Sequence, residues 1–270
     1  MFTERTPRVV AARQLTRRTG RDRDRRFLAE GAQAVREALA WADAGRGAVH
    51  EVFTTAVAAQ RNAELLDRAL DQGIPVSEVT DKAADGLSET VSPQGLVAVC
   101  DLVDQPLRDA LRAAPALVAV LVGVSDPGNA GTVLRVADAA GADAVLLAGD
   151  TVDPHNGKCV RASTGSLFHL PVARSRDTDA VLAACREAGL RLVAADGYAE
   201  HDLDQAERAG ELAGPTAWVF GSEAHGLPDE LLAETDTALR VPIHGQAESL
   251  NLATAAAVCL YTSARVQRSA

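Results

Sequence analysis

Two short segments in the last third of the chain decide its fold: Val219-Phe220-Gly221-Ser222-Glu223-Ala224-His225-Gly226-Leu227 and Val241-Pro242-Ile243-His244-Gly245-Gln246-Ala247-Glu248-Ser249-Leu250-Asn251-Leu252. In each, glycine, carboxylate, amide or hydroxyl groups follow an apolar run, as at the end of a buried strand. A similar segment, residues 125–135, lies upstream of both. Where a strand stops, backbone N–H and C=O groups become free to hold a ligand. The three segments are therefore candidates for ligand binding.

The second half of the chain, residues 115–270, alternates apolar strands with helices. The strands are continuous apolar runs, which is typical of a parallel sheet covered by helices on both faces. We predict strands at 117–124, 144–148, 190–195, 216–221 and 238–241, and helices at 130–140, 177–188, 228–234 and 248–266.

The first half predicts a separate, smaller α/β domain over residues 27–106, joined to the second by a helical linker at 107–114. An apolar stripe at helical spacing runs through residues 27–44. The remaining predicted elements of this domain are strands at 49–53, 73–79 and 95–103 and helices at 58–70 and 81–87.

Composition limits the class of protein. The chain has 270 residues, enough for two ordinary domains, and 47% of them are hydrophobic, as in globular proteins. The longest apolar stretch, residues 115–124, is about half of what a membrane-spanning helix needs. No signal peptide opens the chain, so we expect a cytoplasmic protein. The four cysteines are scattered without metal-ligand spacing, which predicts buried apolar thiols and no metal site.

Charge is distributed unevenly along the chain. The net charge is -10, yet residues 1–26 hold nine arginines against three acidic residues, a balance of +6 that leaves -16 on the rest. This basic N-terminal extension is either a solvated tail or a segment that binds a polyanion through its positive charge. In the second case, four arginines are candidate contacts to that polyanion: Arg17, Arg18, Arg25 and Arg26.

The segment 125–135 predicts a strand end, a Pro-Gly turn and a helix that Asn129 caps. Arg135 lies between one and two helical turns further on and can face back toward the turn. A turn of this kind also suits dinucleotides, but the full G-x-G-x-x-G is absent. The simpler interpretation is a capped helix that carries a surface arginine.

The other two segments also allow two interpretations each. At the end of a buried strand, desolvation of the Glu223 carboxylate costs free energy unless it binds a positive group, and Arg135 is the expected partner. Alternatively, Glu223 belongs to a solvated surface turn. Ser249 or Asn251 either caps the C-terminal helix or lies in a site whose floor is the first turn of that helix.

In this order the three segments resemble the signature of the SpoU (TrmH-type) RNA ribose 2'-O-methyltransferases of the SPOUT superfamily, and the resemblance covers about residues 115–266. Residues 152–168 also resemble the family segment between the first two motifs. The first half resembles the L30e-like substrate-binding domain of many such enzymes, through Phe27-Leu28-Ala29-Glu30-Gly31 and Ser92-Pro93-Gln94-Gly95. Ala224 stands where the family usually has glycine, a small change provided that its φ is negative.

The resemblance implies a SPOUT fold, an α/β sheet whose C-terminal segment forms a deep trefoil knot. Its loops, 219–226, 241–247 and 249–252, would bind S-adenosylmethionine largely through the backbone. Such folds are homodimers with the C-terminal helix, residues 250–266, in the interface. The implied cofactor-binding residues are Gly221, Val241, Ile243 and Leu250.

The resemblance also implies the activity, methyl transfer to a ribose 2'-hydroxyl of RNA. Arg135 would be catalytic, and four residues would orient it and the RNA, namely Asn129, Glu223, Ser249 and Asn251. Because a guanidinium is a poor general base, we expect Arg135 to stabilise the developing oxyanion while a phosphate or water takes the proton. Arg161 is a further candidate RNA contact.

The L30e-like half favours 23S rRNA as substrate over tRNA, in either a housekeeping or an antibiotic-resistance enzyme. A tRNA 2'-O-methyltransferase and a non-catalytic RNA-binding factor on the same fold are the alternatives. A nucleotide-dependent oxidoreductase is not favoured, because this sequence lacks the G-x-G-x-x-G fingerprint of that class.

Overall fold

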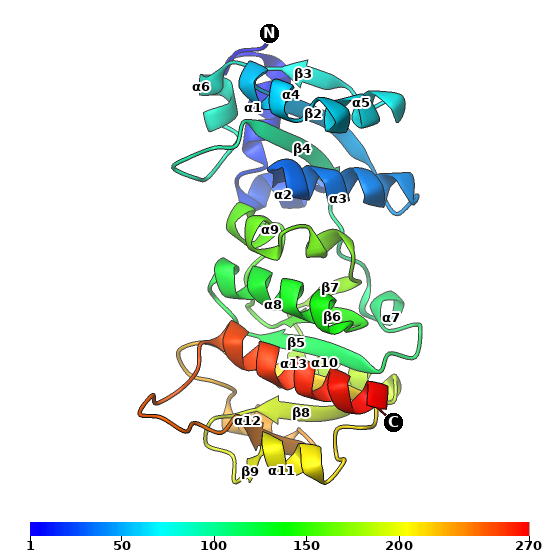
Figure 1. The fold of residues 1–270 in the computed structure, drawn as a ribbon, viewed down its shortest axis with the longest axis vertical. Helices are drawn as coiled ribbons and strands as arrows, with labels where there is room; N and C mark the ends of the chain where they lie inside the picture. The colour runs from blue at the N-terminus through cyan, green and yellow to red at the C-terminus, as the bar shows by residue number, and fades with distance from the viewer. Residues whose placement is uncertain (270) are drawn as a thin grey trace. The chain divides into compact units, whose positions relative to one another are not determined.

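The structure, a computed structural model, describes residues 1–269, and the chain divides into two compact units (Figure 1). Unit 1 consists of Met1–Val103 together with Asp153–His169. Unit 2 consists of Asp104–Val152 and the chain from Leu170 onward.

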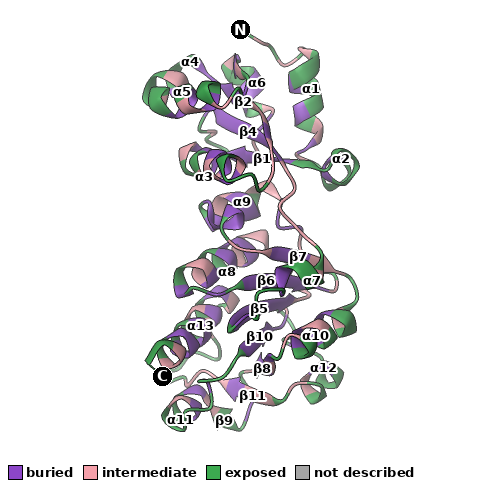
Figure 2. Cartoon of the chain, turned by 90° about the vertical axis from the view of Figure 1, so that its right-hand side faces the viewer, coloured by how far each residue is buried: buried purple, intermediate pink, exposed green. Residues whose placement is uncertain are grey.

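Unit 2 is built on a seven-stranded sheet in the order β7-β6-β5-β10-β8-β11-β9, in which all neighbouring strands are parallel. Its central strands are almost fully buried (Figure 2), which explains why they read as continuous apolar runs. The predicted parallel α/β sheet is therefore confirmed. The strands are β5 (Leu117–Val122), β6 (Ala144–Ala148), β7 (Val172–Ser175), β8 (Arg191–Ala195), β9 (His201–Asp202), β10 (Thr216–Phe220) and β11 (Thr237–Arg240).

Helices cover both faces of this sheet (Figure 2). On one face α8 (Pro127–Ala140) packs against α13 (Leu252–Ser269), and α13 also contacts β5 and β10. On the other face a core that includes Val118 and Val120 packs against apolar side chains of several helices. These are α7 (Leu107–Ala110), α10 (Thr178–Glu187) and α12 (Asp229–Ala233); α11 (Leu203–Arg208) lies beside α13 and β11.

Unit 1 contains a four-stranded sheet in the order β1-β4-β2-β3, in which only β2 and β3 are parallel. The strands are β1 (Arg26–Glu30), β2 (Val49–Thr54), β3 (Val76–Glu78) and β4 (Leu96–Asp101). The helices are α1 (Pro7–Gln14), α2 (Arg18–Asp24), α3 (Ala32–Asp43), α4 (Ala56–Arg61), α5 (Ala63–Asp71), α6 (Asp81–Asp85), α9 (Gly157–Ser163) and the 3-10 turn η1 (Ser166–Phe168).

The helix predicted over residues 27–44 was wrong in its first third. Residues 26–30 form β1, which pairs with β4, and Phe27, Leu28 and Ala29 are buried there. Gly31 separates strand from helix with φ +96°, and a Cβ at this position would lie 2.7 Å from Oε1 of Gln94. Glycine is therefore required here. The apolar residues of β1 matched a helical stripe by coincidence.

The basic N-terminal stretch is not a solvated tail. It forms α1 and α2, and Val9, Ala12 and Leu15 join the core that includes Phe53 and Val97. Arg17, Arg18, Arg25 and Arg26 remain exposed, as a surface that contacts RNA would require.

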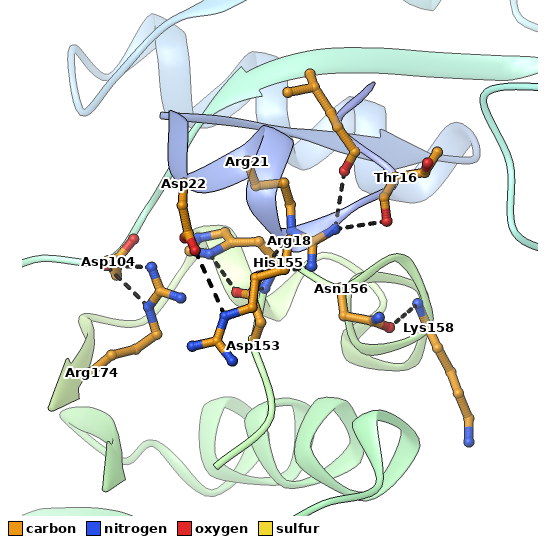
Figure 3. A network of polar contacts seen from close by, with 11 residues as sticks. Thr16, Arg18, Arg21, Asp22, Asp104, Asp153, His155, Asn156, Lys158 and Arg174 are labelled. Carbon is orange, nitrogen blue, oxygen red and sulfur yellow. Dashed lines mark hydrogen bonds and ion pairs between the residues drawn. The ribbon is translucent and has the colours of Figure 1, made fainter. Parts of the chain in front are cut away.

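Residues 153–169, expected inside the second domain, belong to unit 1. The ring of Phe168 lies 5.8 Å from that of Phe27 and 5.7 Å from that of Trp41. The buried guanidinium of Arg21 donates to Asp153 at 2.8 Å and to the carbonyl of Thr16 at 3.0 Å (Figure 3). These contacts explain why residues 153–169 belong to unit 1, which the periodicity of the sequence does not reveal.

The four cysteines, Cys100, Cys159, Cys185 and Cys259, are free and buried, as predicted for most of them. Within residues 1–269 no group of three or more His, Cys, Asp or Glu side chains is arranged to hold a metal ion. No helix in the described part of the chain is long and apolar enough to cross a membrane.

Candidate active site

The site in unit 2 lies at the carboxyl edge of the sheet. Strands β5 and β10 are parallel neighbours, with Val120 opposite Val219 and Leu121 opposite Phe220. The segments that follow both strands therefore leave the sheet at the same edge. This is where open parallel α/β sheets bind ligands.

Glu223, just after β10, connects this segment to the start of α8. Its carboxylate accepts hydrogen bonds from the backbone N–H of Ser125 and of Asp126, each at 3.1 Å, and from the Ser125 hydroxyl at 3.2 Å. The side-chain amide of Asn129 donates a fourth bond at 3.0 Å. Glu223 thus fixes the segment after β5, although ninety-odd residues separate the two in sequence.

Asn129 extends this contact to the third motif. Its Oδ1 accepts a hydrogen bond from Nδ2 of Asn251 at 3.0 Å, while Oδ1 of Asn251 accepts from the backbone N–H of Ala253 at 2.9 Å. Asn251 therefore caps α13 and also contacts the other motifs. One hydrogen-bonded path, Glu223–Asn129–Asn251, joins all three predicted segments.

The electrostatics of Glu223 follow from these donors. Partial burial by itself would raise the pKa of Glu223, but the Asn129 amide and the backbone N–H groups of Ser125 and Asp126 outweigh it and hold the pKa below its usual range. The carboxylate is therefore ionised at neutral pH. The expectation that Arg135 is its partner was wrong: hydrogen-bond donors without a formal charge satisfy it.

Two glycines shape the turn that carries Glu223. A Cβ on Gly221 would lie 2.1 Å from the carbonyl carbon of Gly226, and Gly226 has φ +66°. Both positions therefore require glycine. Ala224 is not among the residues with positive φ, so alanine causes no backbone strain there. The departure from the family pattern leaves the turn intact.

The third motif forms an exposed irregular segment between β11 and α13. Val241 and Leu250 are half-buried, and Ile243 is 38% exposed. Within residues 1–269, the backbone groups from Pro242 to Leu250 make no hydrogen bonds. Ser249 is exposed and lies outside the Glu223–Asn129–Asn251 path. Exposed amide and carbonyl groups beside apolar side chains fit a ligand held mainly through the backbone.

Arg135 is exposed on α8, six residues after Asn129. The predicted N-cap was wrong, because α8 begins at Pro127 and Asp126 caps it, its Oδ1 accepting from the N–H of Asn129 at 2.9 Å. Proline is favoured at the first position of a helix. Sequence reasoning also missed Ser125 as a partner of Glu223, although Ser-Asp-Pro is a recognisable helix start.

The predicted RNA contacts lie in unit 1. Arg18 is half-exposed and lies 3.7 Å from Asp22, and Arg25 ends α2 in the left-handed conformation at φ 53°. Arg161 differs from the other predicted contacts, because its Nη1 donates to the buried carboxylate of Glu30 at 3.1 Å and its side chain is 23% exposed. It can present only part of its guanidinium to RNA.

A polar site at the strand ends of a parallel α/β sheet is typical of ligand-binding α/β proteins. Similar solved structures place this fold in the SPOUT class. Residues 116–261 match the SpoU rRNA Methylase family, and residues 6–98 match the MRM3-like substrate binding domain. The chain belongs to the SpoU rRNA methylase family.

Individual relatives and solved structures are similar to this chain over most of its length. The 23S rRNA (guanosine(2553)-2'-O)-methyltransferase RlmP of Bacillus subtilis (strain 168) is 35% identical over 238 residues, 87% of each chain. An AdoMet-bound rRNA methyltransferase from Sinorhizobium meliloti superposes with a TM-score of 0.82 at 32% identity, over 96% of this chain and 95% of that one. An RNA 2'-O ribose methyltransferase structure gives a TM-score of 0.82 at 34% identity, over 100% and 99%.

The predicted family, enzyme class and cofactor are therefore confirmed: the protein is an RNA ribose 2'-O-methyltransferase that uses S-adenosylmethionine.

Proposed function

We propose that this protein methylates a ribose 2'-hydroxyl of 23S ribosomal RNA. The substrate class rests on the relatives, one of which is named for a guanosine of 23S rRNA, and on the match of residues 6–98 to a substrate-binding domain. The observation that carries the chemistry is the Glu223–Asn129–Asn251 path, because it brings the three motifs of a methyltransferase to one place. Such a protein would act in the cytoplasm, where ribosomes are found.

S-adenosylmethionine supplies, when bound, a methyl group on a positively charged sulfur. The residues that would hold it are Gly221, Val241, Ile243 and Leu250. The exposed backbone groups after Pro242 and the half-exposed Ile243 fit a cofactor with both hydrogen-bonding and apolar parts. Gly221 would contribute by keeping its turn closed against Gly226.

The protein's own residues would position the ribose and stabilise charge. Glu223 is a poor general base, because its pKa is lowered and four donors already occupy its oxygens. It acts as a positioning residue that fixes the amide of Asn129. Asn251 holds the other end of Asn129, and Ser249 is exposed where it can reach substrate.

Arg135 would stabilise the negative charge that develops on the 2'-oxygen. Because a guanidinium is a poor general base, Arg135 would lower the barrier by electrostatics rather than by taking the proton. A phosphate of the RNA or a water molecule would accept that proton.

We further propose that two copies associate through α13 and that the C-terminal segment is knotted. Val258 and Tyr261 are apolar side chains on α13 that are 37% and 49% exposed, one turn apart. The knot is proposed from the family to which the chain belongs. Light scattering on the wild type and on Tyr261→Arg tests the dimer: the variant should be a monomer.

The function is tested with purified protein, radiolabelled S-adenosylmethionine, and unmodified 23S rRNA or bulk tRNA. Label should enter 23S rRNA as an alkali-resistant 2'-O-methyl nucleotide, identified by mass spectrometry. Label that enters only tRNA, or no RNA at all, contradicts the proposal. Comparing rRNA from cells with and without the gene then names the nucleotide.

A further inference from the structure

Unit 1 contains a cavity of about 310 Å³ that the methyltransferase site does not use. It lies between the end of α1 and the chain that follows α6. Its volume is at the lower end of small-molecule pockets. It is lined by Arg13, Gln14, Thr16, Arg17, Asp85, Gly86, Ser88 and Glu89.

Both signs of charge occur in this cavity, and its four charged side chains are exposed. Arg13 and Arg17 come from the end of α1 and the residues after it, whereas Asp85 and Glu89 come from the end of α6 and the chain that follows it. Within residues 1–269, none of these four side chains makes an ion pair or hydrogen bond. Opposite charges that share a small cavity without pairing leave room for a ligand that satisfies both.

The frame of the cavity is rigid, unlike its charged lining. Ser88 donates to the buried carboxylate of Glu30 at 2.8 Å, and its oxygen also accepts from the N–H of Thr90 at 3.1 Å. In the residues after α1, the hydroxyl of Thr16 donates to the carbonyl of Arg13 at 2.9 Å. The backbone that carries the four charges is thus held in place before any ligand binds.

We propose that this cavity binds one unpaired guanosine nucleotide of the RNA substrate, its phosphate on Arg13 and Arg17 and its base edge on Glu89 or Asp85. This inference rests on the proposed function, since it assumes an RNA substrate. Arginine suits phosphate because its planar guanidinium donates paired hydrogen bonds.

The carboxylates select the base. Guanine presents two adjacent donors, N1–H and the N2 amino group, which match the two oxygens of one carboxylate. Adenine, cytosine and uracil each place an acceptor beside their donor on that edge, which a carboxylate repels. Recognition of single RNA bases typically uses such edges of unpaired nucleotides.

A larger side chain in place of Gly86 should fill the cavity without destabilising unit 1. Its backbone has φ -69° and ψ -14°, which any residue adopts. A Cβ there would lie 3.4 Å from Cδ of Arg13. A leucine at this position should therefore occupy the cavity while unit 1 stays folded.

The first test is methyl-transfer kinetics on 23S rRNA with the full chain. Arg13→Ala with Arg17→Ala, and separately Gly86→Leu, should raise KM about tenfold and leave kcat unchanged. In the double arginine variant, the slope of log affinity against log salt should fall by about 0.7 for each phosphate that no longer meets an arginine. The matched control is Arg61→Ala, which removes an exposed arginine of α4 outside the cavity and should change neither value.

The second test measures the nucleotide directly, by ligand-observed NMR with guanosine 5'-monophosphate and with inosine 5'-monophosphate, which lacks the N2 amino group. Guanosine monophosphate should bind several-fold more tightly, and Glu89→Gln with Asp85→Asn should abolish this preference. Equal binding of both nucleotides overturns the guanine assignment.

The two tests separate the sources of the ligand. Binding of the free nucleotide without any change in KM of the cavity variants would mean that the pocket takes a free nucleotide, and would overturn the RNA assignment. If the wild type fails to methylate rRNA, the proposed function fails, and the NMR titration still decides whether the cavity binds a guanine nucleotide.

Discussion

Each unit contains a carboxylate that accepts hydrogen bonds from several N–H groups, and the two carboxylates differ in their surroundings. Asp153 in unit 1 is 4% exposed; it accepts from Arg21 at 2.8 Å and from the backbone N–H of His155 at 3.0 Å. Glu223 in unit 2 is exposed and accepts only from groups without a formal charge. The first carboxylate stabilises a fold, whereas the second positions groups at a surface where substrate can arrive.

The pKa values of both carboxylates are lowered, for different reasons. Burial alone would raise the pKa of Asp153, but His155 and the Arg21 guanidinium more than compensate. For Glu223 the Asn129 amide and backbone N–H groups compensate. A carboxylate with a lowered pKa stabilises the folded state above its ordinary pKa, and this contribution is lost as the pH falls through the lowered value.

The largest effect is expected from Arg21→Ala. The substitution leaves Asp153 buried without its guanidinium and the carbonyls of Leu15 and Thr16 without a donor. Breaking a buried ion pair in this way typically costs about 3–5 kcal/mol. Arg18→Ala, three residues away and in a half-exposed pair with Asp22, is the matched control and should cost below about 1 kcal/mol. Urea unfolding measures both.

Thiol labelling in dilute urea locates this destabilisation. Burial raises the pKa of Cys185 in unit 2 to about 12, and it also raises the pKa of Cys100 in unit 1, so both are unreactive in the folded protein. In Arg21→Ala, mass spectrometry should find Cys100 and Cys159 labelled well before Cys185 and Cys259. Simultaneous labelling of all four would mean that the ion pair stabilises the whole chain and not unit 1.

Arg135→Ala tests the surface role of unit 2. Loss of oxyanion stabilisation should slow single-turnover methyl transfer by about 10²–10³. Because Arg135 is exposed, the free energy of unfolding and the affinity for S-adenosylhomocysteine should stay near those of the wild type. A variant that methylates at the wild-type rate would remove Arg135 from the mechanism.

Much of unit 2 could be predicted from the sequence, because continuous apolar strands and helix periodicity determine a covered parallel sheet. The three site segments were identified mainly through the family resemblance, because Asn251 by itself is equally consistent with a helix cap and the turn around Glu223 with a solvated surface turn. The partner of Glu223 could not be predicted, because hydrogen bonds to the backbone of Ser125 and Asp126 leave no pattern in side-chain chemistry. The sequence also did not predict that residues 153–169 belong to unit 1, because this depends on long-range contacts of Phe168 and Asp153.

Glu223→Gln should have a smaller effect on catalysis than Arg135→Ala. The glutamine keeps the shape but can accept through only one oxygen, so the segment after β5 and the amide of Asn129 are held less firmly. The loss should be about tenfold in kcat, equivalent to one hydrogen bond to a charged group at the lower end of its range. Affinity for the cofactor should change little. A loss as large as that of Arg135→Ala would indicate that Glu223 contacts the reacting atoms.

The smallest effect concerns acid stability and uses the same variant. Near neutral pH, wild type should be more stable than Glu223→Gln by less than about 1 kcal/mol, since water screens an exposed carboxylate. As the pH falls below the ordinary carboxyl pKa of about 4.3 and through the lowered pKa of Glu223, the wild type loses this advantage and the two unfolding curves converge. Glu200→Gln, a change at an exposed carboxylate outside any helix for which residues 1–269 provide no hydrogen-bond partner, is the control and should follow the wild type throughout. A stability gap that stays constant from neutral to acid pH would show that the hydrogen bonds to Glu223 do not depend on its charge. Its role would then be one of shape, and the contrast with the ion-paired Asp153 would be greater still.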